Sequence, residues 1–314
     1  MLELQHIHKF FNPGSVNEIC LFDDFNLTVK DGEFVSVVGS NGSGKTSMLN
    51  IICGSIDIDH GQILIDGKDY AGKKDFVRSR QIGRVFQDPS KGTCPQMTIL
   101  ENMSIAENKG KPFNLTRGVN KAHIDYYREM LAHLNLGLED KMHTPVGALS
   151  GGQRQRIGIA RALAVEPKFI IADEPVSALD VSIQAQILNI LMDLKDEFHF
   201  SYLFIAHDLS VVKHISDSLG VMYLGTIVER APKRLLFSNP VHPYTKALFS
   251  SAPTIDEGNI AESQELRGEI PSPIHLPSGC PFHDRCPMAC PDCAREVPEL
   301  KEVEPGHFAA CHLL

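Results

Sequence analysis

The chain has 314 residues, a formal net charge of −9 and 43% hydrophobic residues, which is ordinary for a globular protein of one large domain or two. The acidic balance argues against a nucleic-acid partner. The sequence contains no apolar run of about 18 residues that would span a membrane, and its start, Met1 to His6, lacks the charged and apolar parts of a signal peptide. We therefore expect the protein to stay in the cytoplasm.

The first 38 residues alternate between apolar and polar side chains, as half-buried strands do. Phe10 and Phe11 end the first of these strands. An aromatic ring at this place can stack on a purine base. A core or hairpin aromatic explains the same pattern, and the spacing leaves both interpretations open.

A phosphate-binding motif lies between a buried strand at 34–38 and a helix at 47–52, and it fits G-x-x-x-x-G-K-[ST]. Its glycines let backbone N–H groups point at phosphate oxygens, and the helix N-terminus adds its dipole. Lys45 should reach the β- and γ-phosphates, and the Thr46 hydroxyl should bind Mg²⁺. We predict that a nucleoside triphosphate is bound by Gly39, Ser40, Asn41, Gly42, Ser43, Gly44, Lys45, Thr46 and Ser47.

Between the phosphate loop and the middle of the chain, the pattern changes from strands to helices. A short strand at 82–87 leaves Gln87 at its end. A glutamine there can bridge the metal or the attacking water, although strand-end glutamines are usually only solvated. From about 97 to 149 the apolar residues fall at helical spacing. We expect a helical insert between two parts of an α/β core.

The helix after this insert begins at Ser150, a good N-cap, and Gly151 and Gly152 leave N–H groups open to an anion. Ser-Gly-Gly alone is a weak signal, because any helix can start this way. The stretch 149–155 therefore indicates a function only in combination with the other motifs.

Two buried strands in the second half end in polar residues. The strand at 168–174 ends in Asp173 and Glu174, where Mg²⁺ needs a carboxylate and an attacking water needs a base. Asp173 suits the metal and Glu174 the water. The strand at 202–206 ends in His207, on the ligand side of an open α/β sheet, although a lone histidine is usually structural. Asp180 caps the helix between these strands.

These motifs together resemble an ATP-binding-cassette (ABC) ATPase over about residues 1–230. The resemblance rests on their order, namely the phosphate loop, Gln87, Leu149–Gln153, Asp173–Glu174, Ser177-Ala178-Leu179-Asp180 and His207. It implies an α/β P-loop NTPase core with an antiparallel β subdomain and a helical subdomain. It also implies two cassettes facing head to tail, with ATP between one phosphate loop and the signature motif of the partner.

The resemblance further implies roles for single residues. Phe11 would stack on adenine, Gln87 would sense the metal and couple to membrane subunits, and His207 would contact the γ-phosphate. Glu174, His207 and Gln87 would then be catalytic. The Mg²⁺ ligands would be Thr46, Gln87 and Asp173. The residues that meet nucleotide across the dimer would be Ser150, Gly151, Gly152, Gln153 and Asp180.

The last 80 or so residues resemble the ending of oligopeptide, dipeptide and nickel importer ATPases, through the segment 239–248 and a run of cysteines. Four thiolates suit a [4Fe–4S] cluster, and the resemblance suggests Cys280, Cys286, Cys293 and Cys311 as its ligands. Cys290 pairs with Cys293 in a single C-x-x-C, which does not make the paired knuckles of a zinc site. Zinc and unliganded cysteines remain alternatives.

The first half of the chain does not resemble the peptide-importer branch. Asn41 and Ser43 stand where the peptide branch usually carries an acidic residue and a cysteine. The stretches 83–89 and 97–103 look more like importer ATPases for small amino-acid-like solutes. The change of likeness falls near Ser150, in a segment that every cassette shares. The chain therefore has the pattern of a mosaic of two importer branches.

We expect an ATPase domain at 1–235, with its helical subdomain at about 97–155, and a cysteine-bearing extension at 236–314. The expected function is ATP hydrolysis for an importer of oligopeptides or dipeptides, at the cytoplasmic face of the membrane. Its partners would be ABC transmembrane subunits, a second ATPase subunit of the same or another chain and, indirectly, an extracytoplasmic solute-binding protein. The cofactors would be ATP, Mg²⁺ and the suggested cluster.

Two other functions fit parts of the sequence. One is the ATPase of an amino-acid-type importer, which the first half favours. The other is a soluble cassette ATPase of DNA repair or translation, but those carry tandem cassettes or long coiled coils, and this chain has no long heptad run. A metalloprotein with a degenerate cassette conflicts with the intact Lys45 and Glu174.

Overall fold

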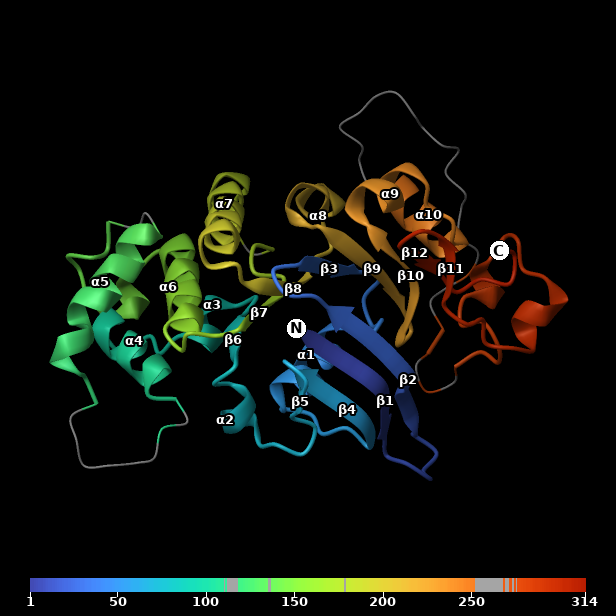
Figure 1. Cartoon of the computed structure of the whole chain (residues 1–314), viewed down its shortest axis with the longest axis horizontal. Coiled ribbons are helices and arrows are strands. Elements are labelled where there is room, and N and C mark those ends of the chain that lie inside the picture. The colour runs from blue at the N-terminus through green and yellow to red at the C-terminus, as the bar shows by residue number, and fades with distance from the viewer. Residues whose placement is uncertain are drawn as a thin grey trace.

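The core of the protein is a mixed sheet of eight strands within the described residues, in the order β11-β12-β10-β9-β3-β8-β7-β6 (Figure 1). The run from β9 to β6 is parallel, and β10, β11 and β12 are antiparallel. This is an α/β core of the expected kind. The computed structural model describes residues 1–109, 111, 118–134, 137–177, 179–251, 268, 271–272, 274 and 276–314.

The central strands of this sheet are short and almost wholly buried, because helices cover one face and α1 together with a second sheet covers the other. The strands are β3 (Phe34–Val38), β6 (Ile82–Val85), β7 (Phe169–Asp173), β8 (Ser201–Ile205), β9 (Ser218–Tyr223), β10 (Thr226–Pro232), β11 (Lys301–Glu304) and β12 (His307–Ala309). The flanking helices are α1 (Lys45–Cys53), α7 (Val181–Phe198), α8 (Leu209–Ile215), α9 (Lys233–Ser238) and α10 (Pro243–Ser250).

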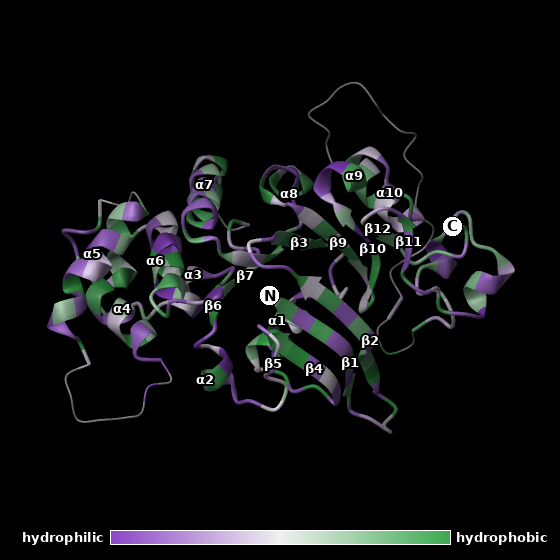
Figure 2. Cartoon of the chain, viewed as in Figure 1, coloured by the Kyte–Doolittle hydropathy of each residue, from purple (hydrophilic) through white to green (hydrophobic). Residues whose placement is uncertain are grey.

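A second, antiparallel sheet has the order β2-β1-β4-β5. Hydrophobic and hydrophilic residues alternate along its strands (Figure 2), so that one face is apolar. Leu2 pairs with Val29 and Leu4 with Leu27, and all four are buried. That face shares one apolar cluster with α1 and with β3 of the core sheet. The strands are β1 (Leu2–Phe11), β2 (Ile19–Val29), β4 (His60–Ile65) and β5 (Lys68–Asp69).

The helical insert lies at one end of the molecule, at the left of Figure 1. Tyr127 and Leu131 are buried along one side of α5, and Leu134 is buried directly after it, so the helical spacing seen in the sequence marks its packed face. Capping boxes begin α4, at Thr98, and α6, at Ser150. The helices around this end are α2 (Asp75–Arg78), α3 (Pro89–Gly92), α4 (Ile99–Glu107), η1 (Lys121–His123), α5 (Ile124–His133), η2 (Val146–Ala148) and α6 (Gly151–Leu163).

The carboxyl-terminal segment is joined to the core sheet. Strand β12 pairs with β10, and β11 adds a further edge. The fully buried Glu229 on β10 accepts hydrogen bonds from the N–H groups of Val241, 2.8 Å, and His242, 3.0 Å, and from His307 Nε2, 2.7 Å. The cysteine-bearing turns include η3 (His283–Arg285) and η4 (Pro291–Ala294). In the described ranges, no helix is long and apolar enough to cross a bilayer.

Candidate active site

The phosphate loop connects β3 to α1 and has the tight curvature that its glycines predict. Gly39 has φ 154° and Gly44 has φ 101°, and a Cβ on Gly39 would lie 2.1 Å from the carbonyl oxygen of Met222. The Lys45 ammonium lies inside the curve and donates to the carbonyls of Gly39, 2.8 Å, and Ser40, 2.9 Å. Burial lowers the pKa of Lys45, and the nearby charge of Glu174 opposes that shift. The loop is thus closed around a buried cation.

The predicted metal ligands Thr46 and Asp173 meet at the ends of α1 and β7. Thr46 Oγ1 donates to Asp173 Oδ1 at 3.3 Å, and Arg84 Nη2 lies 3.8 Å from Asp173 Oδ2. Burial raises the pKa of Asp173, while the charge of Arg84 opposes the rise. A hydroxyl and a carboxylate side by side, next to phosphate-binding backbone, are the oxygen ligands that Mg²⁺ takes in nucleotide sites. These residues therefore fit the ion.

Three residues predicted to be catalytic come together one step further along the sheet edge. Gln87 Nε2 donates to Glu174 Oε2 at 3.2 Å, and His207 Nδ1 lies 3.3 Å from the same oxygen. Gln87 also donates to the Ser177 hydroxyl at 3.2 Å. The side chain of Glu174 is only 21% exposed, whereas His207 is 59% exposed. A carboxylate held between an amide and an imidazole can orient a water for attack on phosphate.

The Ser150 turn and Asp180 form a second group, where α6 meets the start of α7. Ser150 and Gln153 cap the first turn of α6 reciprocally, and the Asp180 carboxylate accepts from Ile183 N–H at 2.9 Å. A Cβ on Gly152 would lie 2.7 Å from Ile183 Cγ2, so this glycine lets the two helices approach. Ser150, Gly151 and Asp180 are exposed, and Gln153 is half-buried.

This second group is not joined to the phosphate loop of its own chain. Among the described residues, no hydrogen bond or ion pair connects Ser150, Gly151, Gly152, Gln153 or Asp180 to residues 39–47, and α6 and α1 lie in different parts of the molecule (Figure 1). Ala178, within the motif 177–180, lies outside the described residues. The contact of these residues with a partner's nucleotide stays a prediction.

Phe11 lies at the end of β1, half-buried and paired with Ile19. Its ring is 5.4 Å from Lys9 Nζ, a cation–π contact. Within the described part of the chain, no ring contact or hydrogen bond joins Phe11 to the phosphate loop. Its proposed stacking on adenine stays a prediction.

Two further residues bear on the site and are absent from the sequence-based set. Gln155 on α6 is 1% exposed, and its Nε2 donates to the carbonyls of Phe86, 2.9 Å, and Pro175, 2.8 Å. It therefore ties the residue before Gln87 to the residue after Glu174. Its signal in the sequence is a glutamine within an otherwise apolar helix face. The other residue is Tyr244, whose hydroxyl accepts from Ser40 N–H at 2.7 Å.

The cysteines near the carboxyl terminus gather in the turns around η4. Cys280 N–H donates to the Cys293 carbonyl at 2.7 Å, and the Sγ atoms of Cys290 and Cys293 are 3.3 Å apart. Burial raises the pKa of the Cys280 thiol to about 11, and the neighbouring Cys293, Cys311 and Cys286 add to the rise. In the described part of the chain, no three histidine, cysteine or acidic side chains are arranged to hold a metal ion. The four-cysteine ligand set stays a prediction.

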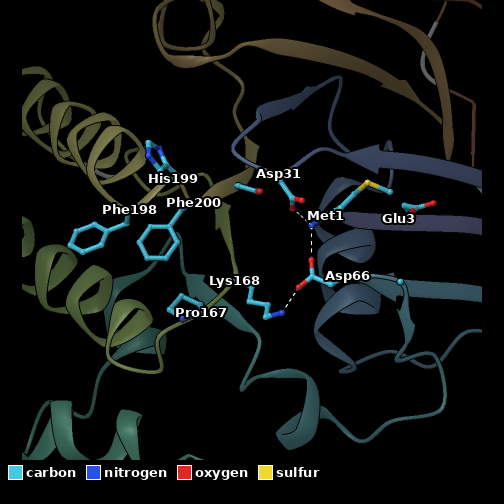
Figure 3. A pocket seen from close by; sticks show the side chains of 11 residues that line it. Met1, Glu3, Asp31, Asp66, Pro167, Lys168, Phe198, His199 and Phe200 are labelled. Carbon is cyan, nitrogen blue, oxygen red and sulfur yellow. Dashed lines mark hydrogen bonds and ion pairs between the residues drawn. The ribbon is translucent and has the colours of Figure 1, made fainter.

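A pocket of about 690 Å³ lies away from this chemistry, at the amino ends of the core strands (Figure 3). Phe198, His199 and Phe200 line one side, and Met1 and Asp66 line the other. The amino group of Met1 is 2.8 Å from Asp66 Oδ1. None of the predicted site residues lines this pocket.

Two family descriptions match the chain. The one described as "ABC transporter" matches residues 22–177, and the one described as "Oligopeptide/dipeptide transporter, C-terminal region" matches residues 228–293. The first covers the phosphate loop, Gln87, the Ser150 turn and Glu174. The second begins on β10 and covers Tyr244 and the first four cysteines of the tail.

Whole proteins and solved structures agree with this. The oligopeptide transport ATP-binding protein AppF of Bacillus subtilis is 42% identical over 100% of this chain and 97% of its own length. A protein of Brucella ovis named as a peptide import ATP-binding protein is 44% identical over 99% of this chain and 97% of its own. The ATP-binding cassette MJ0796, solved as a dimer bound to ADP and Pi, has a TM-score of 0.63 and 32% identity over 74% of this chain and 99% of its own.

The ADP-bound cassette MJ1267, of an ABC transporter, has a TM-score of 0.66 and 28% identity over 76% of this chain and 95% of its own. The α/β P-loop fold class is thereby confirmed. The relatives with peptide-transport names match both halves of the chain, and the mosaic of two importer branches stays a prediction.

Proposed function

Because the chain belongs to the family of ABC transporter ATPases, which hydrolyse ATP, we propose that it powers an importer of oligopeptides or dipeptides. One observation supports this proposal most directly. Lys45, Asp173 and Glu174 lie together at one edge of the core sheet. The same sheet also carries the carboxyl-terminal extension, most of which matches the oligopeptide/dipeptide transporter description. The names of both relatives, which match nearly the whole chain, support the peptide class. An amino-acid-type solute rests only on the stretches 83–89 and 97–103.

The position of each residue determines its role at the nucleotide. Lys45 and the N–H groups of residues 39–47 hold the phosphates, and Thr46 and Asp173 hold Mg²⁺, with Gln87 as its further ligand. A bound Mg²⁺ would supply positive charge against the developing negative charge of the phosphates. Glu174 orients the attacking water, since its carboxylate is fixed by Gln87 and faces His207. His207, more exposed, contacts the γ-phosphate.

The second nucleotide contact comes from another cassette. Ser150, Gly151, Gly152, Gln153 and Asp180 lie on a separate face, and serve the nucleotide held by the partner's phosphate loop. The solved relative MJ0796 is a dimer, which supports this arrangement for an identical or a different second subunit. Phe11 would stack on the adenine of its own site.

The further partners are membrane permease subunits, which place the chain peripherally on the cytoplasmic face of the membrane and connect it indirectly to an extracytoplasmic solute-binding protein. We assign residues 1–235 to the ATPase domain, with its helical subdomain at about 97–155. Residues 236–314 form the extension. The sheet pairing between β10 and β12 crosses this boundary, so the extension is attached to the ATPase domain along its backbone.

The proposal of a [4Fe–4S] cluster on Cys280, Cys286, Cys293 and Cys311 rests on the resemblance and on the closeness of these thiols. The described side chains do not by themselves surround a common metal position. Anaerobic purification followed by iron, sulfide and zinc analysis decides it. About four iron and four sulfide per chain support the cluster, whereas zinc alone or a colourless, metal-free protein rejects it.

The solute class is tested in proteoliposomes that carry peptide-type membrane subunits and a peptide-binding protein. The native chain is compared with a chimera whose residues 76–149 come from a known peptide-importer cassette. If the proposal holds, both chains drive ATP-dependent dipeptide uptake at similar rates. Uptake only by the chimera, with the native chain active on amino-acid-type subunits, would assign the chain to the other solute class.

A further inference from the structure

The carboxyl-terminal extension contacts the phosphate loop through one side chain. Tyr244, on the first turn of α10, is 2% exposed, and its hydroxyl oxygen accepts a hydrogen bond from Ser40 N–H at 2.7 Å. Ser40 is the second residue of the loop, and its carbonyl accepts from Lys45 Nζ at 2.9 Å. The same peptide segment is therefore held from behind by the extension and from inside by the lysine.

Tyr244 is itself fixed from several sides. Its N–H donates to His242 Nδ1 at 3.1 Å, which caps α10. Its ring centroid lies 4.7 Å from that of Tyr223 and 5.4 Å from that of Phe282. Phe282 is 1% exposed and lies two residues after Cys280, so the aromatic cluster links the cysteine-bearing turns to the loop.

We propose that Tyr244 is a positioning residue of the nucleotide site. Its hydroxyl fixes the Ser40 amide and with it the curvature of the loop, so that the remaining N–H groups are already oriented when phosphate arrives. Preorganisation of this kind raises affinity by lowering the ordering cost of binding. The extension thus takes part in nucleotide binding. This inference rests on the proposed assignment of residues 39–47 as the phosphate site.

If Tyr244 only filled space, its ring contacts would be the same, but its hydroxyl would have no function. Tyr244→Phe removes the hydroxyl alone. The matched control is Tyr202→Phe, because Tyr202 is fully buried on β8 and its hydroxyl has no hydrogen-bond partner among the described residues. Both variants remove one buried phenolic oxygen, and only one of them touches the loop.

The experiment uses the purified full chain and three measurements. Calorimetric titration with MgADP gives the Kd, steady-state hydrolysis gives kcat and KM for MgATP, and hydrogen–deuterium exchange reports the Ser40 amide without nucleotide. We expect Tyr244→Phe to raise the Kd and the KM together by about fivefold, the effect of one hydrogen bond. The kcat should stay unchanged, and the Ser40 amide should exchange faster. Tyr202→Phe should alter none of these.

A second variant, Phe282→Leu, keeps the Tyr244 hydroxyl but removes the aromatic ring that packs against Tyr244. This variant should also raise the Kd, by a smaller factor. The proposal is overturned if Tyr244→Phe binds MgADP within a factor of two of wild type with unchanged Ser40 exchange. It is also overturned if both tyrosine variants weaken binding equally. A wild-type chain that does not bind MgADP would refute the phosphate site itself, whereas the exchange of Ser40 would still test the contact.

Discussion

The buried side chain of Gln155 offers a sharp test of how the catalytic groups are held. Its Nε2 donates to the carbonyls of Phe86 and Pro175, which neighbour Gln87 and Glu174. Leucine has nearly the same volume, so Gln155→Leu leaves no cavity but deprives both carbonyls of their partner. Each orphaned buried group costs roughly 1–3 kcal/mol, and the variant should lose about 2–4 kcal/mol of stability.

For a domain of this size, such a loss lowers the Tm by about 2–4 °C per kcal/mol, and thermal melting measures it. The functional effect should fall on kcat. Small misplacements of catalytic groups reduce rates by one to two orders of magnitude, and we expect a decrease of about tenfold or more. The KM for MgATP should stay near wild type, because Lys45 and its loop carbonyls are untouched.

The control is Gln81→Leu. Gln81 is half-buried just before β6, and among the described residues its side chain makes no hydrogen bond. This variant should leave kcat unchanged and the Tm within a degree or two. The reasoning fails if Gln155→Leu melts earlier but hydrolyses ATP at the wild-type rate, since Gln155 would then stabilise the fold without positioning Gln87 and Glu174.

Three other changes have definite expected outcomes. Lys45→Ala removes a buried cation and should weaken MgADP binding about 10- to 100-fold by calorimetry, the size of a charged hydrogen bond; unchanged affinity would remove Lys45 from the phosphate site. Gly152→Ala places a Cβ 2.7 Å from Ile183 Cγ2, so it should lower the Tm in the native background and not in Ile183→Ala; equal effects in both would exclude the clash. The Glu107 carboxyl has a pKa lowered to about 2, because hydrogen bonds outweigh its burial, and the donors are Lys111, His123 and Tyr127. Reduced by solvent screening from the full value of about 3 kcal/mol, its contribution should be about 2 kcal/mol above its unfolded pKa. Urea unfolding should therefore show that the deficit of Glu107→Gln shrinks as the pH falls from about 4.5 toward 2; a pH-independent deficit would contradict this.

The chemistry at the sheet edge was accessible from the sequence because neighbouring parallel strands end together. Asp173, Glu174 and His207 each follow a buried apolar run, and parallel pairing of β7 with β8 brings them to one edge. The same holds for Gln87 after β6. A local pattern was enough there, because the fold class fixes which strand ends meet.

Contacts between remote segments had no such signal. Ser40 and Tyr244 are 204 positions apart, and neither periodicity nor a motif connects them. Strands β11 and β12 are short and carry exposed residues such as Lys301, so their addition to the core sheet depends on tertiary pairing. The role proposed for the Ser150 turn came from the family resemblance and not from the local pattern, since its proposed ligand belongs to another subunit.

The most direct test of the account compares wild type with Glu174→Gln in proteoliposomes that contain peptide-type membrane subunits and a binding protein. The amide keeps the size of the side chain next to Gln87 and His207 but loses the charge that orients water. We expect hydrolysis to fall at least about 100-fold, peptide uptake to stop, and MgATP binding to remain within about twofold of wild type. Near-normal hydrolysis by the variant, or wild-type hydrolysis that peptide does not stimulate, would contradict the account.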